Sequence, residues 1–331
     1  MMWWQAVIDA GAVPVAFVPN PAALRGSKEE RESAAADRAT LVEEAELQAH
    51  PVPERGSARI PQPVSFLAGF SRWAVVACDG IIQLVDAYVA AAARRRDAGG
   101  VLHTTFERNR AFAVAPVERM TPALRQVLEA SAPDIESIDG ELAGHPARYL
   151  ETVDSTVRRV RAGLERDVAE HCIATLGAEE WLLLDGLLSR SPTVARHPRA
   201  LGVINSHGTQ FLEGRGLERA LTLPSGHRTS VFTVRGGHTR TEVYSWYLRL
   251  WPWEGNDLLY GLLRVEARPD PASVALASAL SGWLVAERAP LATPATRWDR
   301  LLYPLHNVQE YLKARAPRDR FTARPRLPVA S

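Results

Sequence analysis

Apolar residues in this chain gather into short runs that have the length of single strands. The first clear run is WAVVACDG at 73–80, which is rich in β-forming residues and ends in Asp-Gly. A second run, WLLLDG at 181–186, ends in the same dipeptide. Short uninterrupted apolar runs that are followed by turn residues indicate buried strands. We therefore expect a buried strand at each place, with an aspartate at its end.

Residues 152–176 carry a helical pattern instead. Their apolar positions repeat every three or four residues, as one face of an amphipathic helix requires. The repeating residues are Val153, Val157, Val160, Leu164, Val168 and Cys172. Gly177 follows at a point where helices commonly stop. This pattern predicts an amphipathic helix between the two Asp-Gly runs.

The remaining segments predict further strands and two closing helices. Residues 81–115 alternate weakly and indicate strands and a helix, and residues 200–205 indicate another strand. Residues 227–234, 242–250 and 259–267 are expected to form an antiparallel meander. Helices are expected at 272–288 and around 298–316. Together these elements predict the α/β class.

The two ends of the chain differ in composition from its middle. Residues 21–62 are Pro-rich, then charged and Ala-rich, then rich in Pro and Arg, which predicts an exposed helix bounded by prolines. We therefore divide the chain into an N-terminal arm at 1–65, a core domain at 66–316 and a basic tail at 317–331.

Composition narrows the class of protein only slightly. The chain has 331 residues, of which 46% are hydrophobic and 23% charged, and its net charge is +1. These values are ordinary for a globular protein and give no electrostatic sign of nucleic acid. Arginine supplies nearly all the basic residues, since Lys28 and Lys313 are the only lysines. Arginine suits phosphate oxygens, but GC-rich coding bias is the simpler explanation, and the arginine content alone does not indicate a function.

Cysteine content and the longest apolar runs predict a soluble, cytoplasmic protein without membrane contact. Cys78 and Cys172 are the only cysteines, too few for a disulfide framework or a cysteine-based zinc site. The start of the chain lacks the pattern of a signal peptide, and no apolar run is long enough to span a bilayer. P-loop, zinc-protease and nucleophile-elbow motifs are also absent from the sequence.

The candidate chemistry rests on three carboxylates. Asp79 and Asp185 end the two apolar runs, and on a helical wheel with Val168 at zero Glu165 falls at about 60°, at the edge of the apolar stripe. Two-metal phosphodiester hydrolysis needs carboxylates that converge from separate elements. The alternatives are plain: Asp-Gly is the commonest hairpin pair, and Glu165 could simply pair with a helix neighbour. Asp154, at about 40° on the same wheel, is a rival for the helix position.

An ordered set of short segments resembles the NurA family of DNA-end-processing nucleases. The segments are CDG at 78–80, LLLDGLL at 182–188, GVINSHG at 202–208, HRTSVF at 227–232, WYLRL at 246–250, LLRVE at 262–266 and LYPL at 302–305. The likeness extends over roughly residues 70–312, and the order of the segments is more specific than any one segment.

This resemblance implies a mixed RNase H-like sheet flanked by helices, and DNA cleavage that depends on Mn²⁺ or Mg²⁺. It also implies a homodimer and partnership with the hexameric ATPase HerA in DNA end resection. By position, Asp79, Glu165 and Asp185 correspond to metal ligands, and Tyr303 corresponds to a tyrosine of the C-terminal motif. That motif has a histidine two turns later, where this chain has Tyr311. His306 is the available substitute, or else a structural histidine.

Arginines on the expected meander are candidates for DNA contact. Arg228 and Arg249 could face DNA phosphates or pair with acidic residues. For Arg264 we expect pairing with Glu266, because residues two apart share a strand face. Where the family has a lysine for DNA phosphate, this chain has Asn205-Ser206-His207.

Two other functions compete with the nuclease. The departures near 205 and 306 favour a non-catalytic RNase H-like module that binds DNA or the ATPase. A phosphohydrolase that acts on nucleotides is a weaker alternative. Trp3 and Trp4, expected to be exposed outside the core, are candidates for dimer or ATPase contacts.

Overall fold

The computed structural model describes residues 2–15, 39–53, 63–138, 146–235, 241–290 and 298–317. Its strands are β1 (Val13–Pro14), β2 (Thr40–Leu41), β3 (Ala49–Pro51), β4 (Val64–Asp79), β5 (Ile82–Arg96), β6 (Leu102–Ala115), β7 (Ile135–Ser137), β8 (Trp181–Asp185), β9 (Ala200–Ile204), β10 (His227–Thr229), β11 (Phe232–Arg235), β12 (Glu242–Arg249) and β13 (Leu262–Ala267).

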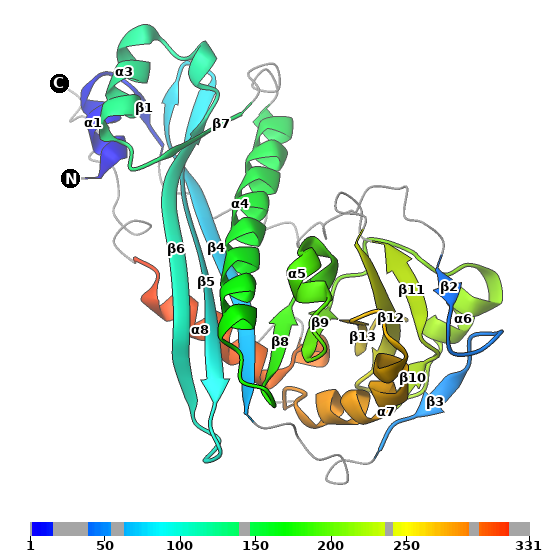
Figure 1. Ribbon diagram of the computed structural model, residues 1–331. Coiled ribbons are helices and arrows are strands. Elements are labelled where there is room, and N and C mark those ends of the chain that lie inside the picture. Colours follow the sequence, from blue (N-terminus) through cyan, green and yellow to red (C-terminus); the bar gives the residue numbers. More distant parts are fainter. Residues whose placement is uncertain are drawn as a thin grey trace.

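Its α-helices are α1 (Trp3–Asp9), α3 (Pro122–Ser131), α4 (Pro146–Thr175), α5 (Pro192–Ala195), α6 (Gly214–Leu221), α7 (Pro271–Ala286) and α8 (Tyr303–Arg315). Short 3₁₀ turns lie at Val117–Arg119, Leu188–Arg190 and Trp298–Arg300. The protein is therefore of the α/β class, with one large mixed sheet and helices against it (Figure 1).

The sheet joins two parts of different design. On one side, β4, β5 and β6 form a long antiparallel meander, and β4 also pairs with β8 in parallel. The parallel strands continue from β8 to β9. On the other side, β9 pairs with β13, which leads through β12 to β11 in antiparallel order. The predicted antiparallel meander of the second half is confirmed.

Two helices cover opposite faces of the long strands, as Figure 1 shows for α4 and α8. Helix α4 packs against Leu67, Ala91 and Leu182 in one hydrophobic cluster. Helix α8 packs, together with α7, against Phe66 and Ala90 on the other face. Because successive strand residues point to opposite faces, β4 is apolar on both sides, which explains its continuous hydrophobic run.

The long meander replaces one predicted helix. Residues 81–115 form β5 and β6, and the helix expected within them is absent. The strand expected at 73–80 is the second half of β4, which begins nine residues earlier at Val64. The helix predicted at 152–176 is α4, and the two closing helices are α7 and α8.

The N-terminal residues lie within the fold. Trp3 and Trp4 are 4% and 3% exposed, and the Trp3 indole N–H donates to Asp86 at 2.7 Å. The expectation that these tryptophans are exposed was therefore wrong, because α1 covers the far end of β4 beside α3. Residues 16–38 and 54–62 of the predicted arm, and 318–331 of the predicted tail, lie outside the described residues.

Within residues 21–62, where an exposed helix is predicted, only 39–53 are described, and these are not helical. Residues 39–53 contain β2 and β3, which extend the sheet beside β11 and β10. Charged residues of this segment pair with the sheet, so the mixed charges that predict an exposed helix form ion pairs and hydrogen bonds across strands instead.

Candidate functional site

Asp185 stands at the carboxyl end of β8, between the neighbouring parallel strands β4 and β9. Gly186 turns the chain away from the sheet with a φ of 146°, and its N–H donates to Val203 O at 2.9 Å. On β9, an added Cβ at Gly202 would lie 2.6 Å from Gly186 O. A glycine at 202 therefore lets the turn after Asp185 lie against β9.

A buried ion pair holds the loop that follows Asp185. Glu266 Oε2 accepts hydrogen bonds from Leu188 N at 2.8 Å and from Ser189 N at 3.3 Å. Its other oxygen lies 2.7 Å from Arg264 Nη1, and both side chains are buried. The predicted Arg264–Glu266 pair is confirmed, and its role here is to fix the loop.

Glu165 approaches this region from α4. Its carboxylate lies against Gly69 of β4, so closely that a Cβ at position 69 would overlap it. By register, Ala68 is the β4 residue that lies next to Asp185, since Leu67 pairs with Leu184. The place on β4 beside the two acids is therefore held by residues without a polar side chain.

Two arginines lie near the Glu165 carboxylate. Arg161 Nε is 3.3 Å from Glu165 Oε1, one helical turn away, and Arg190 Nη1 is 4.0 Å from Glu165 Oε2. Glu165 and Asp185 line one small cavity of about 30 Å³. Its other walls are Leu67, Ala162, Arg166, Ala169, Leu184, Gly186, Leu187, Leu188, Arg190, Ser191 and Val194.

Asp185 is held by a hydrogen bond from the opposite face of the sheet. Gln309 Nε2, on α8, donates to Asp185 Oδ2 at 2.6 Å. Burial raises the pKa of the Asp185 carboxyl above its ordinary value, and the charge of Arg161 and the Gln309 hydrogen bond offset only part of that rise. The two helices that sandwich the sheet thus both act on this one carboxyl.

Asp79 does not belong to this group. It closes the hairpin between β4 and β5, pairing with Ile82, and Gly80 follows with a φ of 59°. Eleven residues of β4 separate Asp79 from the level of Asp185, which is roughly 35 Å of extended chain. Asp79 Oδ2 instead accepts the N–H of Thr121 at 2.7 Å, just before α3. The hairpin alternative is correct here, and Asp79 is not a ligand shared with Asp185.

The C-terminal candidates also differ from expectation. Tyr303 is the first residue of α8 and is 51% exposed, and the backbone N–H of His306 donates to Leu302 O at the start of the helix. Gln309 is the α8 residue that reaches Asp185. Neither Tyr303 nor His306 has a described contact with Asp185 or Glu165, so their predicted role as partners in one site receives no support from the geometry.

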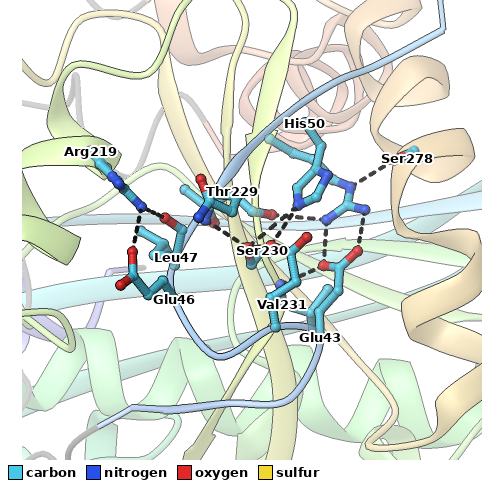
Figure 2. Close-up of polar contacts among 12 residues, drawn as sticks. Glu43, Glu46, Leu47, His50, Arg219, Thr229, Ser230, Val231 and Ser278 are labelled. Atoms are coloured by element: carbon cyan, nitrogen blue, oxygen red, sulfur yellow. Dashed lines mark hydrogen bonds and ion pairs between the residues drawn. The ribbon is translucent and has the colours of Figure 1, made fainter.

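The first of the two predicted DNA-contacting arginines is a buried structural residue. Arg228 forms a two-bonded ion pair with Glu43, at 2.8 and 2.7 Å, and also donates to Ser278 Oγ of α7. Figure 2 shows Glu43 and Ser278 converging on this point, with Val231 beside them. Arg228 is 3% exposed, so its assignment to DNA phosphate was wrong.

Arg249, the second, is 0% exposed and donates to backbone carbonyls, including Leu223 O at 3.2 Å and Leu258 O at 3.0 Å. Burial lowers the pKa of its guanidinium to about 10. Its assignment to DNA phosphate was therefore also wrong, because the guanidinium is used to bind loop carbonyls around the end of β12.

The residues around Asp185 do not fit the predicted pair of divalent ions. A two-metal centre needs several carboxylates that converge on ions a few ångströms apart. Here Asp79 is remote, the adjacent β4 positions carry no ligand, and arginines flank Glu165. Within the described ranges, no three His, Cys, Asp or Glu side chains gather as a ligand set.

Sequence reasoning missed Arg161, Arg190 and Gln309. The spacing of Arg161 and Glu165, one turn apart on α4, was the available signal for their pairing. Gln309 gave no signal, because its partner lies 124 residues earlier in the chain. Arg190 belongs to the short 3₁₀ turn at Leu188–Arg190, which the sequence pattern did not predict.

Comparison with known proteins leaves the family of this chain open. No protein-family model matches the sequence, and no curated protein is significantly similar to it. Among the described helices, none combines the length and the apolar character needed to cross a membrane.

Proposed function

We propose that this protein is a non-catalytic DNA-binding module with an RNase H-like sheet, related to the NurA nucleases of DNA end processing. It acts as a homodimer beside a HerA-type hexameric ATPase, and its acidic pocket has a structural role. We keep the fold and partners that the sequence resemblance implies and give up metal-dependent cleavage.

The topology supports the RNase H-like part of the proposal. An antiparallel meander of β4, β5 and β6 is followed by helix α4, which crosses to β8 and β9, both parallel to β4. This strand order, with a glutamate on the crossover helix and an aspartate at the end of the next strand, is the arrangement that such a sheet would have.

One observation carries the non-catalytic part. The carboxylate of Glu165 is in contact with Arg161 and lies close to Arg190, where a nuclease would need its metal-binding acids to be available to a cation. A half-buried carboxylate that is already neutralised by a guanidinium has little affinity left for a second positive charge.

Arginines at the cavity support a DNA-binding role. The side chains of Arg166 and Arg190, which line the cavity, are 49% and 30% exposed. Exposed guanidinium groups bind phosphate oxygens well and need no sequence preference to do so. The DNA backbone would therefore lie across the end of β8 and the adjoining turn of α4.

Binding to a fluorescein-labelled duplex with a single-stranded overhang tests this function. The wild-type chain should bind, and its affinity should fall as salt rises. Replacing Arg166 and Arg190 by glutamine should reduce the slope of log K against log salt by about 0.9 for each phosphate that the variant no longer neutralises. Arg125→Gln is the matched control, because Arg125 lies on α3, which is beside α1 and away from β8 and α5 (Figure 1). Absence of binding at low salt would overturn the proposal.

A Mn²⁺-dependent nuclease is the second candidate, because Glu165 and Asp185 line one cavity. This function predicts that the purified chain with Mn²⁺ degrades the labelled DNA and that Asp185→Ala abolishes the cleavage. Intact DNA after prolonged incubation with the wild-type chain, at a protein concentration that binds it, would favour the non-catalytic module.

A further inference from the structure

The charges around the cavity are balanced within the protein. Glu165 is 13% exposed, and Arg161 and Arg190 are cationic groups in ion-pair range of its carboxylate. Asp185 lines the same cavity and forms no ion pair within 4 Å among the described side chains. Arg161 and Arg190 are therefore the counter-charges of the acid pair that lines this cavity.

We infer that Arg161 and Arg190 are built-in counter-ions of the Glu165–Asp185 cavity, whose positive charge takes the role that a divalent cation would have beside these two acids. This inference deepens the proposed non-catalytic function and rests on it. The pocket has no use for a metal, because the arginines already balance the acids and would repel a divalent ion.

The local structure holds Arg161 at this place. Its Nε is buried and lies 3.3 Å from Oε1 of Glu165, one turn along α4. Gly69 leaves the space into which the Glu165 carboxylate is directed. Without the arginine, the helix would hold a half-buried glutamate next to a buried aspartate, and two like charges in a poorly hydrated place attract any available cation.

Removing the counter-ion should therefore create a metal site. We expect Arg161→Gln combined with Arg190→Gln to bind one Mn²⁺ per chain about tenfold or more tightly than the wild type, because two repelling charges near the cation are gone. Adding Asp185→Asn to this double variant should abolish the gain. Arg161→Lys, which keeps the charge, should behave as the wild type does.

Electron paramagnetic resonance of free Mn²⁺ during a titration measures this binding without any assay of activity. Arg158→Gln is the matched control, because Arg158 lies on the same helix and pairs with Asp154 instead. Gain of an Asp185-dependent site in the double variant supports the inference. A folded double variant that binds no more Mn²⁺ than the control overturns it.

The wild-type titration separates this inference from the proposed function. Tight, Asp185-dependent binding by the wild type would overturn the non-catalytic function itself. If neither the wild type nor the double variant binds Mn²⁺, only the role of the two arginines would be overturned. If the double variant unfolds, Mn²⁺ should raise its folded fraction in a circular dichroism titration, and no rise would count against the inference.

Discussion

The Glu43–Arg228 pair and the group around Asp185 use the same kinds of side chain, but they balance charge differently. In the first, the carboxylate of Glu43 accepts two hydrogen bonds from Arg228 and one from Val231 N. These bonds outweigh the effect of burial, so the pKa of Glu43 is below its ordinary value. In the second, burial dominates, and the pKa of Asp185 is raised.

The difference shows how to interpret an arginine in this fold. A guanidinium with extensive hydrogen bonding, such as Arg228, joins β10 to α7 and to residues 39–53 and is not available to a ligand. Burial of the Asp185 carboxyl disfavours its charged form and so lowers the stability of the fold. Such a local loss of stability is typical of functional sites. The candidate site is therefore the group around Asp185, and the Glu43–Arg228 pair is structural.

Arg228→Ala should have the largest effect. It leaves the largely buried Glu43 carboxylate without its partner, and breaking a buried pair in this way costs about 3–5 kcal/mol of the free energy of unfolding. Urea unfolding measures the loss. Arg235→Ala, which removes an exposed arginine from its pair with Glu242, should cost less than about 1 kcal/mol. Equal losses in the two variants would show that the Glu43 pair is not the stronger one.

Gly202→Ala should have the next largest effect, a loss of about 1–3 kcal/mol in the free energy of unfolding. Its Cβ would meet the backbone oxygen of Gly186 and push β9 away from the turn that follows Asp185. Gly216→Ala is the control, since a Cβ there meets nothing within 4 Å and a helix favours alanine. Thermal unfolding of both variants tests the contact, and a stable Gly202→Ala would contradict it.

The two acids should give opposite pH dependence. The stabilisation by Glu43 is present above the ordinary glutamate pKa and is lost as pH falls through the lower folded value. For Asp185, the folded pKa is higher, so stability falls as pH rises from the ordinary aspartate pKa to that value.

Glu43→Gln should have a lower free energy of unfolding than the wild type, and this difference should shrink as the pH falls toward about 3. The free energy of unfolding of Asp185→Asn should instead increase relative to that of the wild type as the pH rises. Denaturant titrations between about pH 3 and 8 cover both windows. If the free energy of unfolding changes with pH in the same way in both variants, the charges of Glu43 and Asp185 are not balanced as described.

Asp79→Ala should have the smallest effect. It removes one half-exposed hydrogen bond to Thr121, with an expected loss of about 0.5–1.5 kcal/mol. DNA affinity should be unchanged, because the hairpin lies at the far end of β4 from the cavity. A marked loss of DNA binding would restore Asp79 as a site residue.

Much of the fold could be predicted from the sequence, because strand and helix periods are local. Helix α4 and the β11–β12–β13 meander appear where apolar spacing predicts them. The length of β4 could not be predicted, since its first half pairs with β5 and β8 through contacts remote in sequence.

The site could be predicted only in part, for the same reason. Two Asp-Gly pairs look alike in the sequence, yet Asp79 closes a hairpin and Asp185 ends a parallel strand. Which of them faces a cavity depends on strand pairing, and whether Glu165 is available to a ligand depends on Arg161 and Arg190.

The central claim is that arginines of the protein itself neutralise the acids of the Glu165–Asp185 pocket. Isothermal titration of the wild-type chain with Mn²⁺ tests it most directly. We predict no saturable binding at concentrations up to about 1 mM, which corresponds to a binding free energy weaker than about 4 kcal/mol. Micromolar binding of one or two ions per chain that Asp185→Asn abolishes would contradict it.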